Sequence, residues 1–122
     1  MLYFCPGMPI VFVIARDWTL RTSVRAELRE AGIEALGMES ADDAGKSLAS
    51  GQLPSAVVLE AIAGLADDPR IASLVARAPT ILVASRTEPV ALPPVAAVLY
   101  RPVRIGDVVA KVKDLLRKGH AA

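Results

Sequence analysis

Apolar runs and stretches with helical spacing alternate along the chain. Three runs are apolar at almost every position and contain many β-branched residues, which is typical of strands buried on both faces of a sheet. They cover residues 10–14, 56–59 and 80–84. The more mixed segments 33–38 and 95–100 are expected to form an edge strand and a fifth strand.

Helical spacing and capping residues predict four helices between and after these strands. Thr19 is expected to cap the first, and Ser40-Ala41-Asp42-Asp43 has the form of a capping box. The third helix is expected to start with two acids and a proline, Asp67-Asp68-Pro69. The first helix is predicted at about 20–31 and the third at 69–78. A weak second helix is predicted to end at Gly51, and a last helix to run from Ile105 to Gly119.

The segment Glu88–Pro94 breaks this alternation, because it contains three prolines. Proline lacks a backbone N–H and disrupts a helix interior. A helix between the fourth and fifth strands is therefore expected to be reduced to one turn at most.

Strands that alternate with helices predict a parallel sheet with helices on both faces, because parallel neighbours need crossover connections. The expected fold class is α/β, a doubly wound five-stranded parallel sheet of flavodoxin-like type. In such sheets ligands bind beyond the carboxyl ends of the strands. The residues expected there are Ala15-Arg16-Asp17, Glu60-Ala61, Ala84-Ser85-Arg86 and Tyr100-Arg101-Pro102.

Length and charge limit the alternatives. The 122 residues correspond to one domain, which we place at 10–118 between an N-terminal leader, 1–9, and a short tail, 119–122. The chain has 14 Lys and Arg against 13 Asp and Glu, a formal net charge of +1. This balance favours neither nucleic acid nor a membrane surface as a partner.

Cys5 is the only cysteine and His120 the only histidine. A single cysteine rules out an intrachain disulfide and fits a reducing cytoplasm. His120 lies in a tail expected to fray, so histidine-based catalysis and a histidine metal site are not expected. We therefore predict no catalytic residue, no metal and no cofactor, and a cytoplasmic location.

The layout from Ile10 to Leu116, together with the strand-end residues, resembles the receiver domain of two-component response regulators. That family has an acidic pair after its first strand that helps to hold Mg²⁺. Val13-Ile14-Ala15-Arg16-Asp17 occupies this place, so Ala15 and Arg16 replace the two acids and Asp17 is shifted by one position. Glu60 stands where the family has its phosphorylated aspartate.

Two further motif positions also differ from the family. Ala84 aligns with the family's hydroxyl residue and Ser85 follows one residue late, while Arg101-Pro102 replaces Lys-Pro. A glutamate and a displaced aspartate are poor ligands for Mg²⁺, which needs oxygen atoms in octahedral geometry. Two interpretations stay open: simple loss of phosphorylation chemistry, or a Glu60–arginine pair that imitates a phosphorylated state, with Arg16 or Arg101 near the Glu60 carboxylate.

The resemblance implies an atypical, phosphorylation-independent receiver-like domain that acts as a protein-interaction module in bacterial two-component-type signalling, and not as an enzyme. The alternative is a small flavodoxin-like nucleotide-binding or enzymatic domain, since a fold by itself does not decide function. Arg16-Asp17-Trp18 disfavours that alternative, because a phosphate-binding loop would have glycines there.

A domain without a reactive centre must act through its surface. We expect protein partners and a homodimer formed by residues 90–99 and the last helix, with no nucleic acid and no membrane as partner. The interface candidates are Leu92, Val95, Tyr100 and, near the strand ends, Trp18. Charged substitutions at Leu92 and Val95 are expected to weaken association and to leave the fold intact.

Overall fold

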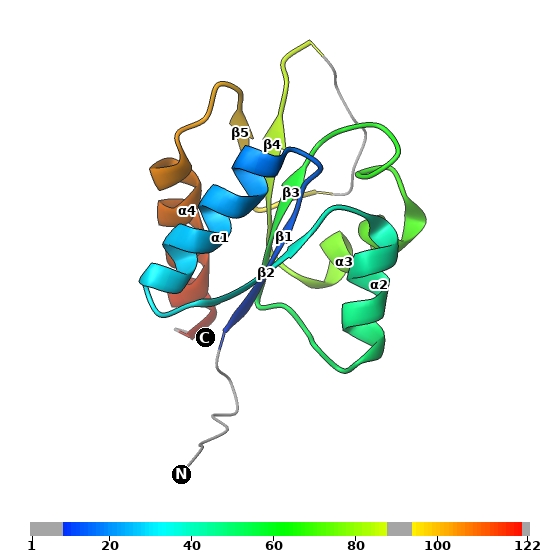
Figure 1. Cartoon of the computed structure of the whole chain (residues 1–122), viewed down its shortest axis with the longest axis horizontal. Helices are drawn as coiled ribbons and strands as arrows, with labels where there is room; N and C mark the ends of the chain where they lie inside the picture. The colour runs from blue at the N-terminus through cyan, green and yellow to red at the C-terminus, as the bar shows by residue number, and fades with distance from the viewer. Residues whose placement is uncertain (1–8, 88–93, 121–122) are drawn as a thin grey trace.

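The computed structural model describes residues 9–87 and 94–120. Within these residues, five parallel strands form one sheet in the order β2-β1-β3-β4-β5, and four helices accompany it (Figure 1). The elements along the chain are β1 Ile10–Ile14, α1 Trp18–Glu30, β2 Glu34–Met38, α2 Ala41–Ala49, β3 Ala56–Glu60, α3 Pro69–Arg77, β4 Thr80–Ala84, β5 Ala97–Tyr100 and α4 Ile105–His120. The doubly wound α/β fold predicted from the sequence is confirmed.

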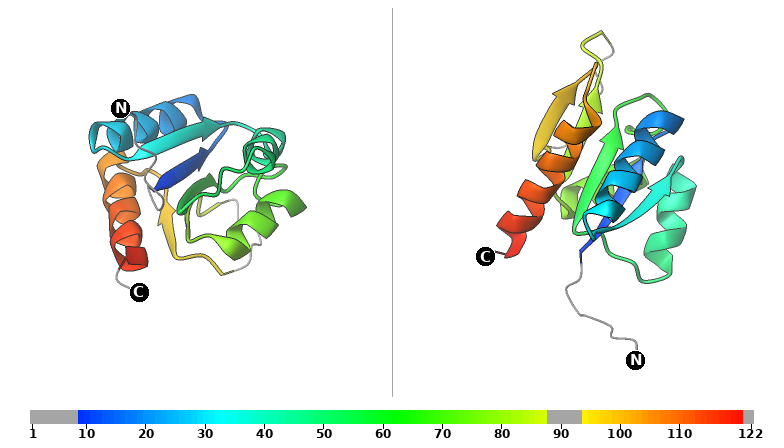
Figure 2. Two further views of the ribbon diagram at one scale, coloured as in Figure 1. Left: turned by 90° about the horizontal axis from the view of Figure 1, so that it is seen from below. Right: turned by 60° about the vertical axis from the view of Figure 1, so that its left-hand side comes forward.

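The helices form a layer on each side of the sheet. Helices α1 and α4 cover one face, and α2 and α3 cover the other (Figures 1 and 2). Alternate residues of each central strand enter two separate cores, so Val11 and Val13 pack toward α1 and α4 while Phe12 and Ile14 pack on the opposite side. Because both faces of the central strands are buried, these strands are apolar at almost every position, and the exceptions are Glu60 at the end of β3 and Thr80 at the start of β4.

Parallel pairing brings the carboxyl ends of the strands to one edge of the sheet. β3 lies between β1 and β4, and β5 forms the edge beyond β4. At this end of the sheet the paired residues are Ile14 with Leu59, Glu60 with Val83, and Ala84 with Tyr100. The loops after β1, β3 and β5 therefore surround a common site.

The start of α1 differs from the prediction. The helix begins at Trp18 and its cap is Asp17, whose Oδ1 accepts a hydrogen bond from the Leu20 backbone N–H at 3.1 Å, so Thr19 is not the cap. A carboxylate at this position satisfies an otherwise free helix N–H. The caps Ser40 of α2 and Asp68 of α3 follow the predicted patterns.

The other boundaries shift by a few residues. β3 includes Glu60, α2 ends at Ala49 before Gly51, and α4 continues to His120, past the expected stop at Gly119. A φ of +92° at Gly51 lets the chain reverse after α2, since residues with a side chain rarely adopt this conformation. The leader lies almost entirely outside the described residues.

The β5 side of the sheet has a thinner cover than the centre. β5 begins at Ala97, later than predicted, and its residues are alternately half-buried and exposed. Val98 and Tyr100 are exposed on the face that α2 and α3 cover elsewhere. Between β4 and β5 the described residues, 85–87 and 94–96, contain no helix, and 88–93 lie outside the described part.

Within residues 9–87 and 94–120, no helix has the length and apolar character needed to cross a membrane.

Candidate functional site

A buried glutamate occupies the carboxyl end of β3. Glu60 is 7% exposed, and both of its carboxylate oxygens are bonded. Oε1 accepts hydrogen bonds from the backbone N–H groups of Arg16 at 2.8 Å and Asp17 at 3.1 Å. Oε2 accepts one from Nη2 of Arg101 at 2.9 Å. The loop after β1 and the loop after β5 thus converge on one carboxylate.

Arg101 joins two acids with one guanidinium group. While Nη2 contacts Glu60, Nη1 lies 3.1 Å from Oδ2 of Asp17. The backbone N–H of Arg101 donates to the Ala84 carbonyl at 2.8 Å, which fixes the residue next to the end of β4. The planar fork of arginine suits this double contact, whereas a lysine ammonium has no such geometry. The Arg101–Pro102 peptide bond is cis.

Asp17 connects this cluster to α1. Its Oδ1 caps the helix and its Oδ2 pairs with Arg101. The hydrogen bond from the Leu20 backbone N–H is the largest cause that lowers the pKa of Asp17 below its usual value, and the charge of Arg101 adds to it against the opposing effect of burial. Asp17 therefore remains ionised at neutral pH beside the arginine.

Arg16 contributes through its backbone and not through its guanidinium group. Its side chain is directed to the loop after β3, where Nη2 lies 3.3 Å from the Gly64 carbonyl oxygen. Gly64 has a φ of +82°, and an added Cβ would lie 3.3 Å from the same guanidinium nitrogen. Of the two predicted arginines, only Arg101 places its guanidinium on Glu60.

The remaining predicted site residues do not join the cluster. Ala15 is fully buried under α1, and Ala84 is buried at the end of β4. The Ser85 hydroxyl is 2.8 Å from that of Thr87 and accepts from the Thr87 N–H, so it stabilises the turn after β4. No hydrogen bond links Ser85 to Glu60 within the described residues.

The donor set does not fit Mg²⁺. The two carboxylates at this edge, Glu60 and Asp17, share Arg101, and the second Asp17 oxygen caps α1. A divalent cation needs several free oxygen ligands, and the arginine occupies the space between the acids. Among the residues the structure describes, no three Asp, Glu, His or Cys side chains gather as a metal site. No buried side-chain polar atom there lacks a hydrogen-bond partner.

Two arginine–aromatic contacts beside the cluster were not predicted. Arg21 Cζ lies 5.3 Å from the Trp18 ring centroid, and its Nη1 also donates to the Ala15 carbonyl at 2.7 Å. Their spacing of three residues on a helix could have indicated the first contact. Arg86 Cζ lies 4.4 Å from the Tyr100 ring centroid, a contact that only the pairing of β4 with β5 creates.

The interface candidates differ in their surroundings. Trp18 is 69% exposed and Tyr100 is 44% exposed, so both are accessible. Val95 is half-buried and packs against the core below α2 and α3, so we expect a charged substitution there to lower the stability of the fold as well as any association. A charge at this position would lose apolar burial in the fold itself. Leu92 lies outside the described residues.

Comparison with known proteins identifies the fold. No protein-family model and no curated protein sequence matches the chain. Among solved structures, a response regulator receiver protein from Burkholderia phymatum is 20% identical with a TM-score of 0.71, and the match covers 88% of this chain and 94% of that one.

A CheY-like receiver domain protein from Methanospirillum hungatei JF-1 is 17% identical with a TM-score of 0.77, covering 94% of this chain and 99% of that one. The signal receiver domain of an HD domain-containing protein from Pseudomonas fluorescens Pf-5 is 14% identical with a TM-score of 0.76, covering 93% and 98%. The chain therefore has the fold of response-regulator receiver domains.

Proposed function

We propose that the chain is a receiver-like domain that works by binding proteins in two-component-type signalling and is not phosphorylated at residue 60. The bonding of Glu60 carries this proposal. Both of its oxygens are held, one by two backbone N–H groups and the other by Arg101. In this arrangement Arg101 occupies the place beside the carboxylate that a divalent cation would need, and each oxygen already accepts at least one hydrogen bond, which makes the carboxylate a poorer nucleophile toward a phosphoryl donor.

The site accordingly acts as a fixed connection between three strand ends. Glu60 at the end of β3 joins the start of α1 to the residue after β5. In this proposal the cluster stabilises one arrangement of the carboxyl-end loops, and partners recognise the surface around it. This function requires no catalytic residue and no cofactor, and it fits the cytoplasm. Whether the cluster imitates a phosphorylated state is the second, finer part of the proposal.

The phosphorylation proposal is tested with a small phosphoryl donor. The protein is incubated with acetyl phosphate and Mg²⁺ beside a receiver domain with an intact acceptor aspartate, and both are weighed intact. We expect the control to gain about 80 Da, the mass of one added phosphoryl group, and this protein to gain nothing. A stoichiometric gain that is lost in Glu60→Gln would overturn the proposal.

Metal binding is tested separately by thermal unfolding. A ligand raises the melting temperature only if it binds the native state. We expect millimolar Mg²⁺ to leave the melting temperature unchanged beyond the effect of Na⁺ at equal ionic strength. A saturable rise that Glu60→Gln abolishes would show that Mg²⁺ displaces Arg101, contrary to the proposal.

A further inference from the structure

The edge of the sheet at β2 has open backbone groups. β2 is the outermost strand beside β1 and lies between α1 and α2 (Figure 1). The Met38 carbonyl accepts a hydrogen bond from the Ala15 N–H at 2.9 Å, so Met38 faces β1. Because backbone groups alternate in direction along a strand, Ala35 and Gly37 face away from the sheet. Nε of Arg25 donates to the Ala35 carbonyl at 3.3 Å, and no other hydrogen bond to these outward groups occurs within the described residues.

Gly37 leaves the middle of this edge uncovered. The residue is exposed and its φ is not positive, so the backbone conformation does not require a glycine. An added Cβ would lie 3.2 Å from Cγ of Arg21 and 3.6 Å from Cδ of Arg25. A glycine inside a strand often marks a place where another backbone approaches closely. Both the N–H and the carbonyl of Gly37 are therefore accessible to a further strand.

A groove of about 380 Å³ follows the same edge. β2 supplies Leu36, Gly37 and Met38 to its lining, while α1 and α2 supply residues that include Arg25, Lys46 and Ser47. β2 has five residues, so the edge has the length of a short extended peptide. The groove thus combines open backbone groups with side chains from two helices.

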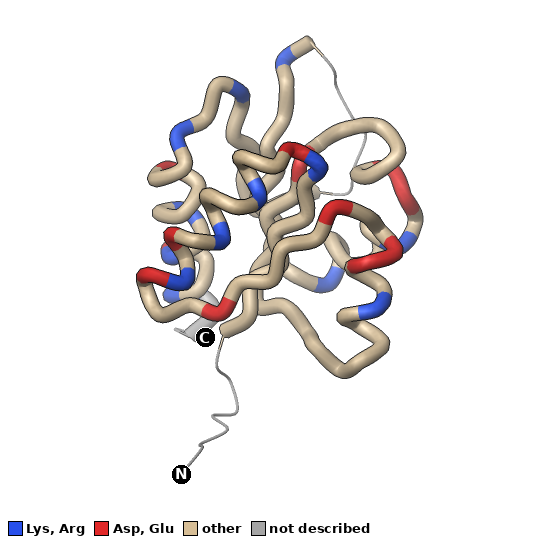
Figure 3. Tube along the Cα trace, viewed as in Figure 1, with Lys and Arg blue, Asp and Glu red and all other residues tan. Residues whose placement is uncertain are grey.

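Two cations flank the open edge. Arg25 of α1 and Lys46 of α2 have no ion-pair partner among the side chains that the structure describes, whereas Arg29, also on α1, lies 3.1 Å from Glu34. Figure 3 shows that basic positions recur along α1 beside β2. The acid that lines the groove, Asp43, lies in the first turn of α2, where the helix N-terminus stabilises its charge. Acidic side chains of a ligand would therefore find their partners beside the middle of β2.

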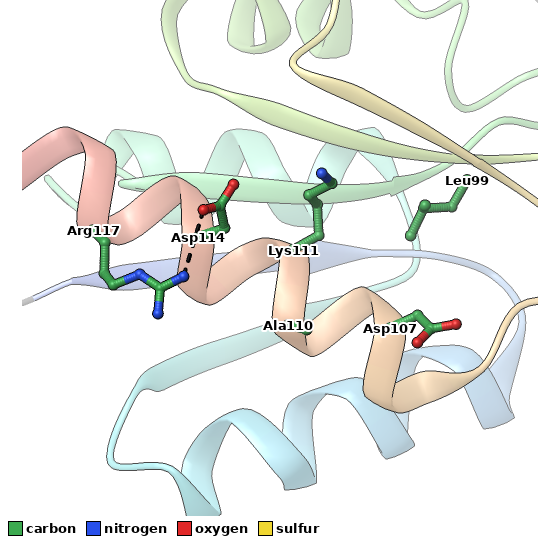
Figure 4. A pocket seen from close by; sticks show the side chains of 6 residues that line it. All are labelled: Leu99, Asp107, Ala110, Lys111, Asp114 and Arg117. Carbon is green, nitrogen blue, oxygen red and sulfur yellow. Dashed lines mark hydrogen bonds and ion pairs between the residues drawn. The ribbon is translucent and has the colours of Figure 1, made fainter.

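The groove at the opposite edge of the sheet lacks this combination. It lies between β5 and α4, and Figure 4 shows the side chains that line it. Five of its six lining residues come from α4, so helix side chains and not a strand edge form most of it. Its acids and bases are equal in number, and Arg117 lies 3.5 Å from Asp114. This second groove serves as the control surface in the experiment below.

We propose that the β2 edge binds an extended segment of a partner protein that carries two adjacent acidic residues. The proposal rests on the protein-binding function proposed above and names the chemistry of the partner. The added strand exchanges main-chain hydrogen bonds with Gly37. Successive side chains of a strand point to opposite faces, so one acid meets Arg25 on the α1 side and the next meets Lys46 on the α2 side. In this mode main-chain bonds supply affinity and alternate side chains supply specificity.

The probe is a synthetic peptide with the core Val-Asp-Glu-Val. Two peptides of equal length serve as controls, with the neutral core Val-Asn-Gln-Val and the basic core Val-Lys-Lys-Val. Binding is followed by the amide shifts of the labelled protein in NMR spectra. We expect saturable shifts with the acidic peptide at millimolar concentration, binding about tenfold weaker with the neutral one, and none with the basic one. High salt should weaken the acidic peptide most, because its ion pairs are screened.

Hydrogen exchange distinguishes an added strand from a peptide held by charge alone. The N–H groups of Ala35 and Gly37 face the open edge, so both should exchange several times more slowly when the acidic peptide is bound. The N–H groups of Leu36 and Met38 face β1 and should exchange as they do in the free protein. A peptide that merely lies on the two cations would leave all four rates unchanged.

Charge reversal tests the two cations. Lys46→Glu changes an exposed side chain and leaves the backbone edge as it is, and we expect it to bind the acidic peptide about tenfold more weakly. Lys111→Glu makes the same change in the groove of Figure 4 and should bind as the wild type does. The double variant Arg25→Glu/Lys46→Glu should prefer the basic peptide. Circular dichroism checks that each variant is folded.

Four results overturn the inference: no saturable shift with the acidic peptide, equal affinity for the neutral peptide, an unprotected Gly37 N–H in the complex, or equal losses in Lys46→Glu and Lys111→Glu. Protection of Gly37 that grows with protein concentration and needs no peptide would assign the edge to a second copy of this chain and also overturn it. None of these results affects the proposed function, which the acetyl phosphate experiment tests separately. Conversely, phosphorylation of Glu60 would overturn the proposed function and leave a peptide bound at β2 in place.

Discussion

Two clusters in this protein use the same chemistry in different surroundings. In each, one arginine bridges two carboxylates: Arg101 contacts Glu60 and Asp17 at the carboxyl end of the sheet, and Arg70 contacts Asp68 and Asp42 between α3 and α2. The first cluster joins the ends of three strands, and the second lies on the helical surface. A list of ion pairs would treat them as equivalent.

Burial distinguishes the two clusters. The Glu60 side chain is 9% exposed, whereas those of Arg70 and Asp42 are 54% and 73% exposed. A buried carboxylate that loses its partner is solvated only in part, while exposed charges are fully solvated again. Glu60 also accepts two backbone hydrogen bonds that determine the course of the chain after β1. These surroundings, more than the number of ion pairs, decide how strongly a cluster restricts the fold.

The largest effect is expected for Arg101→Ala, which leaves the Glu60 carboxylate without its cation. The free energy of unfolding should fall by about 2 kcal/mol, less than for a fully buried pair because Arg101 is partly exposed. This change in the free energy of unfolding is measured by urea unfolding at pH 7. Arg104→Ala is the control, since Arg104 is exposed and has no ion pair in the described part of the chain. Equal losses in both variants would show that the contact of Arg101 with Glu60 contributes nothing of its own to stability.

Glu60→Gln is expected to have a smaller effect, a loss of about 1–2 kcal/mol, because the amide oxygen can still accept the backbone hydrogen bonds. Combined with Arg101→Ala it completes a double-mutant cycle. Once the carboxylate is absent, removal of the arginine should cost much less than in the wild type, and the difference measures the coupling of the pair. Strict additivity would mean that the contact contributes nothing of its own.

The pH dependence of stability is the next effect in size. The pKa of Asp17 is lowered in the folded state, first by the hydrogen bond from Leu20 and then by Arg101. The unfolded chain therefore takes up the proton first as pH falls, so the stabilisation is complete above the unfolded pKa and is lost as pH falls through the folded value. Asp17→Asn retains a capping oxygen but not the charge. Its urea midpoint should fall less than that of the wild type between pH 5 and about pH 3.

The smallest effect is expected for Arg70→Ala. Arg70 and Asp42 are exposed and Asp68 is half-buried, so the urea midpoint at 0.15 M salt should stay close to that of the wild type, and high salt should remove any difference at low salt. The pKa of Asp68 is lowered mainly by its hydrogen bond to the Arg70 side chain. A loss as large as that of Arg101→Ala would show that the surface cluster holds α2 and α3 together.

Local patterns along the chain are enough to predict the strands and the layers of the fold. The apolar runs at β1, β3 and β4 could be recognised because both faces of these strands are buried, which removes the polar positions that an exposed face would retain. Ser40 and Asp68 were recognisable as caps because a cap acts on backbone atoms two or three residues away. The position of Glu60 at the end of such a strand also predicts that it lies in a cluster at the sheet edge.

The connections within that cluster depend on the packing of segments that are far apart in the chain. Arg16 and Arg101 were equal candidates in the sequence, but the chain after β1 turns so that Arg16 presents its backbone N–H to Glu60 and its side chain to Gly64. Arg101 reaches Glu60 because β5 lies beside β4, although 41 residues separate the two in the chain. A local pattern depends only on residues that are close to one another in the chain. The direction of a side chain depends on packing among distant segments, which no local pattern contains.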